Sequence, residues 1–338
     1  MLTAQLVAPR EFRLEQQEVL PPGPGEIQVH VDAVGICGSD VHWYAEGGIG
    51  DTPAQFPMVL GHEPAGTVMR TGEGVTGWSP GDRAALEPAI YCYNCEHCRA
   101  GRHNVCANIR FLSNPGEPGF FREYVNLPAK NLVPVPGNLS APIASLVEPL
   151  AIGLHSVAIA AIQPGESVAV FGAGPIGLLT IAAVKLVGAR RIYALEPVRH
   201  RRDLAHLLGA DEALDPSEVD MLPAVDCAID CAAKQDTTNQ AIRAVRNAGR
   251  VALTGIHSEA MVPFDVSPMR RKEVAILTVR RSNHESEAAR DILVERTNWF
   301  APLVTHCRPL ENIAEAFGIV EQYADGVGKL VIQPLTAQ

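Results

Sequence analysis

Two patterns of hydrophobic and polar positions divide the chain. In the first 90 residues, short apolar runs alternate with polar positions, as in 27–31, and turns rich in Pro and Gly separate the runs. Alternation with a period of two residues predicts half-buried strands, and the turns end each strand early. We therefore expect a β-rich domain of small-barrel type, with strands at 26–34, 65–69, 83–86 and 123–126.

From about residue 163 to residue 300, short apolar runs alternate with longer helix-like stretches. Such alternation builds a doubly wound parallel sheet, which binds ligands at the carboxyl ends of its strands. The expected strands are 167–171, 191–195, 225–231, 250–254 and 275–279. The expected helices are one that follows 172–177 and ends at about 187, and those at 199–208, 237–247 and 286–297.

The end of the chain returns to the first pattern. After residue 302 we expect short strands, a helix at 310–321 and a terminal strand at 329–333 that rejoins the first domain. The fold class is therefore α/β, with a β-rich N-terminal domain and a doubly wound parallel-sheet domain. The expected domains are 1–147 together with 301–338, and 148–300.

Length and composition fit this division. At 338 residues the chain is too long for one ordinary core, and an apolar content of 47% suits a folded chain. The net charge of −10 argues against nucleic acid or an anionic membrane as the main partner. The N-terminus lacks the pattern of a secretory signal, and apolar runs such as 176–187 are too short to cross a bilayer. We expect a cytoplasmic protein.

Four of the eight Cys residues lie close together in one loop. In a reducing compartment, such crowding favours a metal site over disulfides. Four thiolates complete a tetrahedral shell around Zn²⁺ and leave no position for a substrate, so this site is expected to be structural. Disulfides or an iron–sulfur cluster are the alternatives. The ligands would be Cys92, Cys95, Cys98 and Cys106.

A second candidate site begins in the stretch 35–42, which contains Cys37, Ser39 and His42. A thiolate binds Zn²⁺ well, and an open zinc position can acidify an oxygen. Ser39 and His42 are spaced so that they could carry the released proton to water. The alternative for an isolated Cys is a small, buried apolar residue.

Three further polar residues suit the same site. His62 belongs to the commonest type of metal ligand, and the neighbouring Glu63 could bind the metal or orient a ligand. Glu148 lies among apolar residues, where a carboxylate is costly unless a partner such as a metal or its water is present. The alternatives are a local hydrogen bond for His62 and a surface position for Glu148.

The strand expected at 167–171 is followed by G-x-G-x-x-G, with glycines at 172, 174 and 177, and then by a helix. This is the context that the motif requires for dinucleotide binding. The three glycines permit a tight turn, close approach of the pyrophosphate and close packing of helix on strand. The helix N-terminus then attracts the phosphates.

Glu196 ends the next expected strand, about twenty residues beyond the glycines. A carboxylate there accepts hydrogen bonds from ribose hydroxyls and repels a 2′-phosphate, which favours NAD over NADP. The basic run 199–202 points the other way, because a 2′-phosphate binds Arg.

These motifs together resemble the zinc-containing medium-chain alcohol dehydrogenases. The stretches 37–42, 61–63, 92–106, 147–149 and 172–177 occur in the order seen in that family, and the likeness covers nearly the whole chain. The chain is most similar to the polyol (sorbitol/L-iditol, xylitol) dehydrogenase branch at 35–42, 47–50, 87–88 and 147–150. The resemblance implies an N-terminal GroES-like catalytic domain, a Rossmann domain and a cleft between them.

The resemblance also implies roles for single residues. Cys37 and His62 would hold a catalytic zinc, with Glu63 as the third protein ligand. Glu148 would bind the zinc water or enter the ligand shell, and Ser39 and His42 would form the proton relay. The four-Cys loop would hold a structural zinc, which some animal polyol dehydrogenases lack.

For the cofactor and substrate, the resemblance implies two sets of contacts. Trp43 and Arg281 stand where polyol enzymes often carry Tyr, so sorbitol itself does not follow as the substrate. The implied NAD-binding residues are Gly172, Gly174, Pro175, Ile176, Gly177, Glu196, Arg201, Thr254, Ile256 and Arg280. The implied substrate contacts are Ser39, Trp43, Phe111, Glu148 and Arg280.

The implied activity is oxidation of a polyol or another secondary alcohol to a ketone, with hydride transfer to NAD, in a homo-oligomer (tetramer or dimer). An L-threonine 3-dehydrogenase is the nearest alternative. A non-catalytic NAD-binding sensor or structural protein is an alternative of another class, against which the intact zinc and relay residues argue. Nucleic-acid binding through the four-Cys loop has only Arg99, Arg102 and His103 in its favour.

Overall fold

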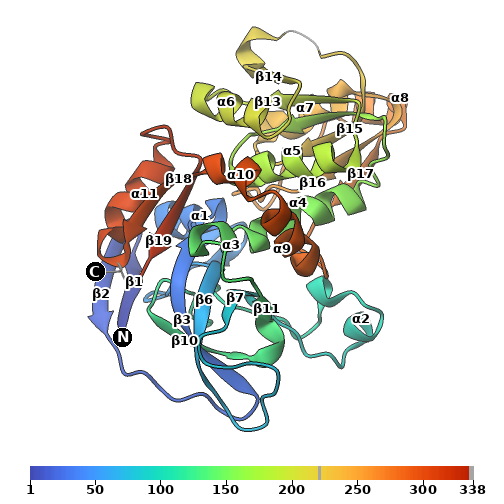
Figure 1. The fold of residues 1–338 in the computed structure, drawn as a ribbon. Coiled ribbons are helices and arrows are strands. Elements are labelled where there is room, and N and C mark those ends of the chain that lie inside the picture. The colour runs from blue at the N-terminus through green and yellow to red at the C-terminus, as the bar shows by residue number, and fades with distance from the viewer. Residues whose placement is uncertain (220–221, 335–338) are drawn as a thin grey trace. The chain divides into compact units, whose positions relative to one another are not determined.

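The computed structural model describes residues 1–219 and 222–334, in which the chain forms two compact units (Figure 1). Unit 1 contains Met1–Glu148 and Ser286–Gln338, and unit 2 contains Pro149–Glu285. Each unit has its own sheet, antiparallel for the most part in unit 1 and parallel in unit 2. The α/β fold class expected from the sequence is therefore confirmed, whereas the exact domain limits stay predictions.

Helix α9 (Ser286–Glu295) lies in unit 1, although the sequence analysis placed this segment in the second domain. It packs on α3 (Ala141–Ala144) and on β11 (Leu132–Pro134). Its buried residues Ser286, Ala289 and Leu293 have helical spacing, so a single face of α9 meets these elements.

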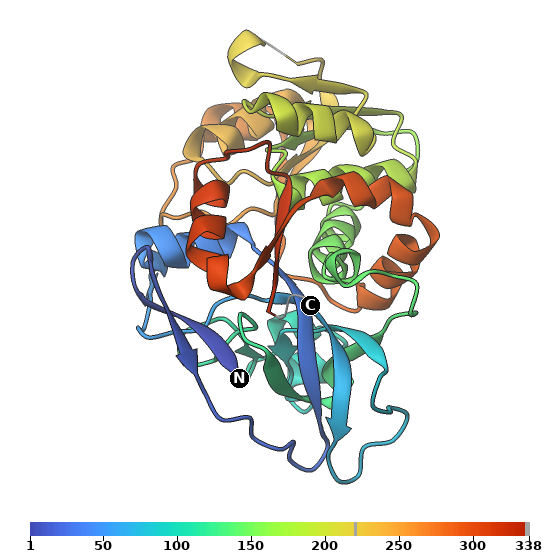
Figure 2. The ribbon, with the colours of Figure 1, turned by 60° about the vertical axis from the view of Figure 1, so that its left-hand side comes forward.

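The main sheet of unit 1 has the strand order β11-β7-β6-β3-β19-β18, and β10 also pairs with β3. Figure 2 shows β19, from the C-terminal segment, running beside β3, and the two strands pair antiparallel. The predicted strands are confirmed here, and Ile27, Val29 and Val31 of β3 enter the core at alternate positions. The bounds are β3 Glu26–Gly35, β6 Glu63–Thr71, β7 Arg83–Leu86, β10 Tyr124–Pro128, β18 Val304–Pro309 and β19 Lys329–Gln333.

Smaller elements complete unit 1. Three antiparallel pairs join β1 (Leu2–Ala8) to β2 (Glu11–Gln16), β4 (Gly48–Ile49) to β5 (Thr52–Pro53), and β8 (Ala89–Ile90) to β9 (Arg110–Phe111). The remaining helices are α1 Gly38–Glu46, α2 Glu96–Arg99, α10 Thr297–Phe300 and α11 Ile313–Glu321, with 3-10 turns at His103–Val105, Ala129–Asn131, Ala301–Leu303 and Leu310–Asn312.

An aromatic cluster forms part of the core of unit 1. The ring of Phe317 on α11 lies 4.8 Å from that of Tyr44 and 5.8 Å from that of Phe121. Phe121 and Phe317 are fully buried. Helix α11 of the C-terminal segment is therefore fastened to the N-terminal part of the chain by apolar burial, the main favourable term in folding.

The sheet of unit 2 is parallel throughout, in the order β14-β13-β12-β15-β16-β17 (Figure 1). The strand order reverses between β12 and β15, and ligands of such sheets bind at this point. The strands are β12 Ser167–Phe171, β13 Arg191–Leu195, β14 Glu212–Leu214, β15 Val225–Asp230, β16 Val245–Leu253 and β17 Ala275–Thr278. The helices are α4 Val147–Ile159, α5 Pro175–Val187, α6 Arg199–Leu207, α7 Gln235–Ala244 and α8 Val266–Lys272, with a 3-10 turn at Pro216–Glu218.

One boundary in unit 2 differs from the prediction. The helix expected at 237–247 ends at Ala244, and the strand expected to begin at 250 begins at Val245. Val245 pairs with Val225 across the sheet, and the left-handed φ of 54° at Ala248 breaks the regular pattern between the two halves of β16. Pairing with a neighbouring strand therefore overrides the local helical pattern.

The stretch Ala141–Ile159 is long and apolar enough to cross a membrane by length and composition, which the sequence analysis did not recognise. However, 72% of it is buried inside the protein, as in the core helix of a folded domain. Gly153 lets this helix approach α5 closely, since a Cβ there would lie 3.1 Å from the backbone of Leu179.

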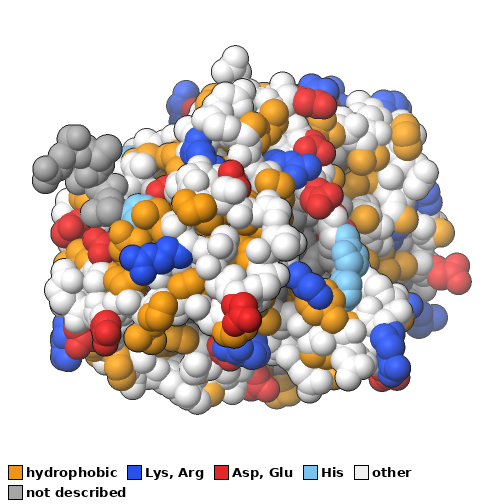
Figure 3. Space-filling model, turned by 60° about the horizontal axis from the view of Figure 1, so that its bottom comes forward, with side chains coloured by type: hydrophobic (Ala, Val, Ile, Leu, Met, Phe, Trp, Pro, Cys, Tyr) orange, Lys and Arg blue, Asp and Glu red, His pale blue; other side chains and the backbone are white. Residues whose placement is uncertain are grey.

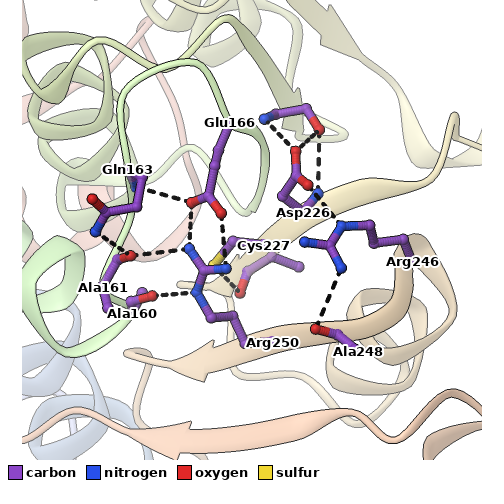
Figure 4. A network of polar contacts seen from close by, with 11 residues as sticks. Ala160, Ala161, Gln163, Glu166, Asp226, Cys227, Arg246, Ala248 and Arg250 are labelled. Carbon is purple, nitrogen blue, oxygen red and sulfur yellow. Dashed lines mark hydrogen bonds and ion pairs between the residues drawn. The ribbon is translucent and has the colours of Figure 1, made fainter.

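Charged residues join the amino ends of the parallel strands (Figure 4). Asp226 accepts hydrogen bonds from the Ser167 N–H and hydroxyl, both at 2.8 Å, and from Arg246 Nε at 2.7 Å. Arg250 binds both carboxylate oxygens of Glu166 and also donates to the carbonyl of Ala161 at 3.1 Å. The network therefore ties β12, β15 and β16 together at the edge away from the glycine-rich turn.

Candidate metal centre and cofactor site

Cys37, His62 and Glu63 meet at one end of the unit 1 sheet. In the register of β3 and β6, Gly35 lies opposite Glu63, so Cys37 follows β3 just where His62 precedes β6. One ligand atom from each of the three side chains lies within 4.8 Å of the others. A thiolate, an imidazole and a carboxylate at this spacing are a donor set typical of zinc.

Asp40, which the sequence analysis missed, organises these residues. It is fully buried, and its carboxylate accepts hydrogen bonds at 3.1 Å from the backbone N–H groups of Cys37 and Gly61. The Ser113 hydroxyl donates to the same carboxylate at 3.2 Å, and His62 Nδ1 lies 3.3 Å from it. Asp40 on the Nδ1 side leaves Nε2 of His62 for a metal, the usual arrangement of a carboxylate behind a ligating imidazole.

Asp40 and His62 each stabilise the charged form of the other. Burial raises the pKa of Asp40, but the His62 ring and the N–H groups of Cys37 and Gly61 outweigh burial and hold the pKa below its ordinary value. Burial lowers the pKa of His62, but Asp40 and the Cys37 thiol outweigh that effect and keep the pKa well above its ordinary value. A local signal for Asp40 exists, because it stands at the third position of the helix that Cys37 begins.

Glu63 and Glu148 carry buried carboxylate oxygens with no hydrogen-bond donor among the described residues. These are Oε1 of Glu63 and Oε2 of Glu148. Burial raises the pKa of Glu148 to about 8, opposed by the His62 ring and supported by Glu63 and Glu87. Buried oxygens without donors are costly unless a cation is present, so the residues fit a bound zinc ion. Glu148 itself lies outside the group of three ligand atoms.

Lys329, which the sequence analysis also missed, brings a buried ammonium into contact with this group. Its ammonium contacts Glu63 Oε2 and donates to the carbonyl of Ile36 at 2.8 Å. Both side chains of the pair are fully buried. No local pattern could indicate this contact, because Lys329 comes from the last strand of the chain.

The remaining candidates of unit 1 lie on α1 and β9. The Ser39 hydroxyl is 3.3 Å from His62 Nε2, and His42 Nδ1 is 3.0 Å from Glu46 Oε1 near the surface. The Phe111 ring lies 5.6 Å from the His62 ring. Trp43 is only 4% exposed and belongs to the hydrophobic core, so its expected substrate contact stays a prediction.

The four-Cys loop brings its sulfur atoms together. Cys106 Sγ lies 3.4 Å from Cys92 Sγ and 3.9 Å from Cys95 Sγ, and all four thiols are free. Four sulfurs at a Zn–S distance of about 2.3 Å around a tetrahedral ion lie about 3.8 Å apart. The N–H groups of Asn94 and Cys95 lower the pKa of Cys92 to about 6, whereas burial raises that of Cys98 to about 12. This loop therefore fits a structural zinc ion.

The glycine-rich turn in unit 2 has the shape that a dinucleotide requires. Gly172 has a left-handed φ of 87°, and a Cβ there would lie 2.8 Å from the Cβ of Ala232. A Cβ on Gly177 would overlap the carbonyl of Gly172. A Cβ on Gly174 would have no atom nearer than Arg201 Nη1 at 3.9 Å, so the turn is open at the N-terminus of α5.

Glu196 is buried at the end of β13 and binds the turn itself. Its Oε2 accepts from the N–H of Ala173 at 2.7 Å, and its Oε1 accepts from the N–H of Val198 at 3.0 Å. Arg202 is held by Asp215 at 3.0 Å, whereas the buried Arg201 faces the turn near Gly174. The carboxylate retains lone pairs for a ribose because each oxygen accepts only one of these bonds.

The other expected cofactor residues stand at carboxyl ends of strands. Thr254 follows β16, is buried and donates to the Ser156 hydroxyl at 3.0 Å. Ile256 is 51% exposed in the loop beyond it, and Arg280 is exposed two residues after β17. Pro175 and Ile176 begin α5. The parallel sheet thus presents these residues, from separate parts of the chain, along one edge.

A dinucleotide turn on a parallel sheet in one unit and a candidate zinc centre in the other define a zinc-binding dehydrogenase. The sequence matches the alcohol dehydrogenase GroES-like domain over residues 23–137 and the zinc-binding dehydrogenase domain over residues 175–295.

Known proteins resemble the whole chain. A sorbitol dehydrogenase from Bacillus subtilis is 32% identical over 336 residues, which cover 96% of this chain and 95% of that protein. The crystal structure of 2R,3R-butanediol dehydrogenase from Bacillus subtilis superposes with a TM-score of 0.88 at 30% identity, over 99% of both chains. A protein described as a zinc-binding dehydrogenase from Sinorhizobium meliloti 1021, bound to NADP, gives 0.90 at 28% identity, over 98% of this chain and 99% of that one. The chain belongs to the zinc-containing medium-chain dehydrogenases, in their polyol dehydrogenase branch.

Proposed function

We propose that the protein oxidises a polyol or a related secondary alcohol to a ketone and transfers the hydride to NAD. The main support for this proposal is that the ligand atoms of Cys37, His62 and Glu63 lie within 4.8 Å of one another. The glycine-rich turn of unit 2 supplies the cofactor side of the same reaction. Similarity to enzymes named for sorbitol and butanediol supports an alcohol with neighbouring hydroxyls.

Cys37, His62 and Glu63 would hold the catalytic ion, and Glu148 is the candidate for an additional or exchanging ligand. When bound, Zn²⁺ supplies a Lewis acid that lowers the pKa of an alcohol hydroxyl. Asp40 keeps the imidazole of His62 in a fixed orientation through its contact with Nδ1. Cys37 is fixed in turn, because its N–H donates to the same carboxylate.

Ser39 and His42 provide a path for the proton that leaves the alcohol. The Ser39 hydroxyl lies beside His62 Nε2, and His42 follows three residues later on α1, so both side chains share one face of the helix. Ser39 would accept the proton and pass it to His42, whose Nδ1 faces the exposed Glu46. The proton then reaches water.

The glycine-rich turn would hold the pyrophosphate of NAD at the N-terminus of α5. Glu196 would accept hydrogen bonds from the ribose and repel a 2′-phosphate, and Arg201 would contact the cofactor near Gly174. Thr254, Ile256 and Arg280 would line the cofactor at neighbouring strand ends. Bound NADP in the Sinorhizobium meliloti relative makes the choice of NAD a point for measurement.

Ser39, Trp43, Phe111, Glu148 and Arg280 are the proposed substrate contacts. We infer a homo-oligomer, either a tetramer or a dimer, in the cytoplasm, with no nucleic-acid or membrane partner. On the face seen in Figure 3, acidic and basic side chains are mixed. The net charge of −10 supports the absence of a nucleic-acid partner. Sedimentation of the purified protein measures the assembly.

The test is a screen of the zinc-loaded protein with NAD across sugar alcohols, simple secondary alcohols and threonine, followed by absorbance of the reduced cofactor. We expect the highest kcat/KM among the polyols, and much lower activity with NADP. Preference for threonine would assign the alternative activity. Binding of NAD with no turnover of any alcohol would indicate a sensor and contradict the proposal.

A further inference from the structure

The ion pair between Glu63 and Lys329 has no place in the proposed proton path or hydride transfer. Both side chains are fully buried, and their contact joins the β6 strand to a residue 266 positions later in the chain. Isolated buried charges are costly, and even a buried pair stabilises a fold poorly compared with apolar residues of similar size. Because Glu63 is also a candidate metal ligand, we look for a role of this buried pair other than stabilising the fold.

Three neighbouring strands hold the pair in place. In the sheet order β6-β3-β19, Glu63 stands on β6, Lys329 on β19 and Gly35 on the strand between them. A Cβ on Gly35 would overlap Glu63 Oε2 and would lie 2.5 Å from Lys329 Cε. The absence of a side chain at Gly35 thus opens the space in which the carboxylate and the ammonium meet across β3.

The two oxygens of Glu63 have different surroundings. Oε2 contacts the Lys329 ammonium, which the Ile36 carbonyl also holds at 2.8 Å. Oε1 is buried and accepts no hydrogen bond from any described residue. Glu63 is also one of the three residues whose ligand atoms lie within 4.8 Å of one another. One carboxylate is therefore shared between a fixed cation of the protein and the metal position.

We propose that Lys329 is a positioning residue of the metal centre, which holds back the Glu63 carboxylate and keeps zinc bound less tightly than the ligand set alone would allow. This proposal rests on the proposed function, because it assumes a zinc ion at Cys37 and His62. Zn²⁺ carries two positive charges, and Cys37 with Glu63 supplies two negative charges. With the buried Asp40 carboxylate also counted, Lys329 brings the site to zero net charge, whereas without Lys329 the site would carry one negative charge that disfavours an anionic oxygen on the substrate.

Removing the charge of Lys329 is expected to change the zinc affinity in an unusual direction. Losing a residue that only supports the structure weakens metal binding or leaves it unchanged. Lys329→Met removes a cation that repels zinc and competes for Glu63, so it tightens zinc binding. Charges a few Å apart interact strongly even at an effective dielectric constant of about 20, and we therefore expect zinc to bind at least about tenfold more tightly.

The experiment is a zinc titration of the full-length protein against a chelator, with the Cys37→Ser variant defining the sites that do not depend on Cys37. Lys329→Met is compared with wild type, and Lys329→Arg, which keeps the charge, is expected to bind zinc within about threefold of wild type. Arg10→Met is the matched control, because it removes an exposed cation from unit 1 that pairs with Glu321. Its zinc affinity is expected to equal that of wild type.

A second comparison does not depend on the folding of Lys329→Met. Glu63→Gln leaves the Lys329 ammonium without its carboxylate, and adding Lys329→Met to Glu63→Gln produces a neutral pair. We expect the double variant to bind zinc at least about tenfold more tightly than Glu63→Gln alone. Thermal unfolding should show a larger zinc-dependent rise in Tm for Lys329→Met than for wild type, because its metal-free form carries an unpaired buried carboxylate.

Equal zinc affinity in both comparisons, or weaker binding after Lys329→Met, would overturn this proposal while leaving the proposed function intact. Failure of wild type to bind any Cys37-dependent zinc would overturn both. None of these readouts requires turnover, so the choice of alcohol substrate does not affect them.

Discussion

The carboxylate of Glu196 is fastened to the backbone on both sides, by the N–H groups of Ala173 and Val198. It therefore has two consequences for the cofactor: it shapes the glycine-rich turn, and it places a negative charge where a 2′-phosphate would lie. The residue type and its distance from the glycines could be recognised in the sequence. Its hydrogen bond to the turn could not, because that contact depends on the parallel pairing of β12 and β13.

Replacing Glu196 by Ala should affect both consequences. We expect kcat/KM for NAD to fall by about tenfold to a hundredfold, and the preference for NAD over NADP to weaken, because the turn loses an acceptor and the repelling charge disappears. Steady-state kinetics with both cofactors measure this. Glu212→Gln, which removes an exposed partner of Arg191 in the same unit, serves as the control. An unchanged NAD/NADP ratio in Glu196→Ala would remove the ribose argument.

Glu148 makes the metal-free protein sensitive to pH. Burial raises the pKa of this carboxyl from 4.5 to about 8, so between these values the folded state binds a proton that the unfolded state has lost. The free energy of unfolding should therefore fall as pH rises from about 4.5 to 8, by up to about 1.4 kcal/mol per pH unit. Urea unfolding of the metal-free protein across this range measures the slope. Glu148→Gln should flatten it, and an equal slope in that variant would contradict the assignment.

Among the residues of the candidate metal centre, those with a recognisable chemistry were found from the sequence, and those with a supporting role were not. Cys37, His62 and Glu63 could be proposed because thiol, imidazole and carboxylate are metal ligands in any fold. Asp40 and Lys329 act through contacts that depend on tertiary structure. A Lys at the start of an apolar strand gives no sign that it meets a carboxylate two strands away.

At the scale of elements, two glycines of the glycine-rich turn are required for different reasons, one for packing and one for ligand binding. Gly177 is required by packing, since a side chain there would overlap the carbonyl of Gly172. Gly174 is required by the ligand, since a Cβ there would have no atom nearer than Arg201 Nη1 at 3.9 Å but would stand at the N-terminus of α5. The motif alone could not distinguish these requirements for this chain, whereas the backbone positions do.

Two alanine substitutions test this separation. Gly177→Ala should lower the free energy of unfolding by about 1–3 kcal/mol, because the turn must move to relieve the overlap. Gly174→Ala should change it by less than about 0.5 kcal/mol, yet weaken NAD binding at least about tenfold by blocking the pyrophosphate. Denaturant unfolding and NAD titration of the two variants provide the comparison. If Gly174→Ala destabilised the fold as much as Gly177→Ala, the assigned roles would be wrong.

The charged network at the amino ends of β12, β15 and β16 predicts a loss of stability without a loss of chemistry (Figure 4). Arg250→Met leaves Glu166 without its ion-pair partner and removes a donor from the carbonyls of Ala160 and Ala161. Since the side chains are less than one-fifth exposed, we expect about 2–4 kcal/mol of destabilisation.

The kcat/KM for NAD should stay within about twofold of wild type, because the network lies at the strand ends opposite the turn. Arg191→Met breaks an exposed pair with Glu212, which solvent screens, and should destabilise the fold much less than Arg250→Met. Unfolding curves of both variants give the difference. Equal effects would show that burial does not decide the strength of these ion pairs.

At the scale of the whole molecule, the change from period-two alternation to βα units correctly predicted two different sheets. It placed most of the strands that it predicted within one or two residues, because alternating or continuous apolar runs record which faces of a strand are buried. It did not place α9 in unit 1, and it did not recognise the helical stretch at 141–159 as long and apolar. Both depend on which surface a helix meets, and a helical pattern shows only that one face is apolar.

The central claim is that Cys37 holds a zinc ion that the reaction requires. The measurement that tests it most directly is the rate of NAD reduction by the best polyol substrate in Cys37→Ser, with the zinc content of the same sample. We predict that zinc falls from about two ions to about one per chain, and that turnover falls at least about a thousandfold. A Cys37→Ser protein with normal turnover and an unchanged zinc content would contradict the account.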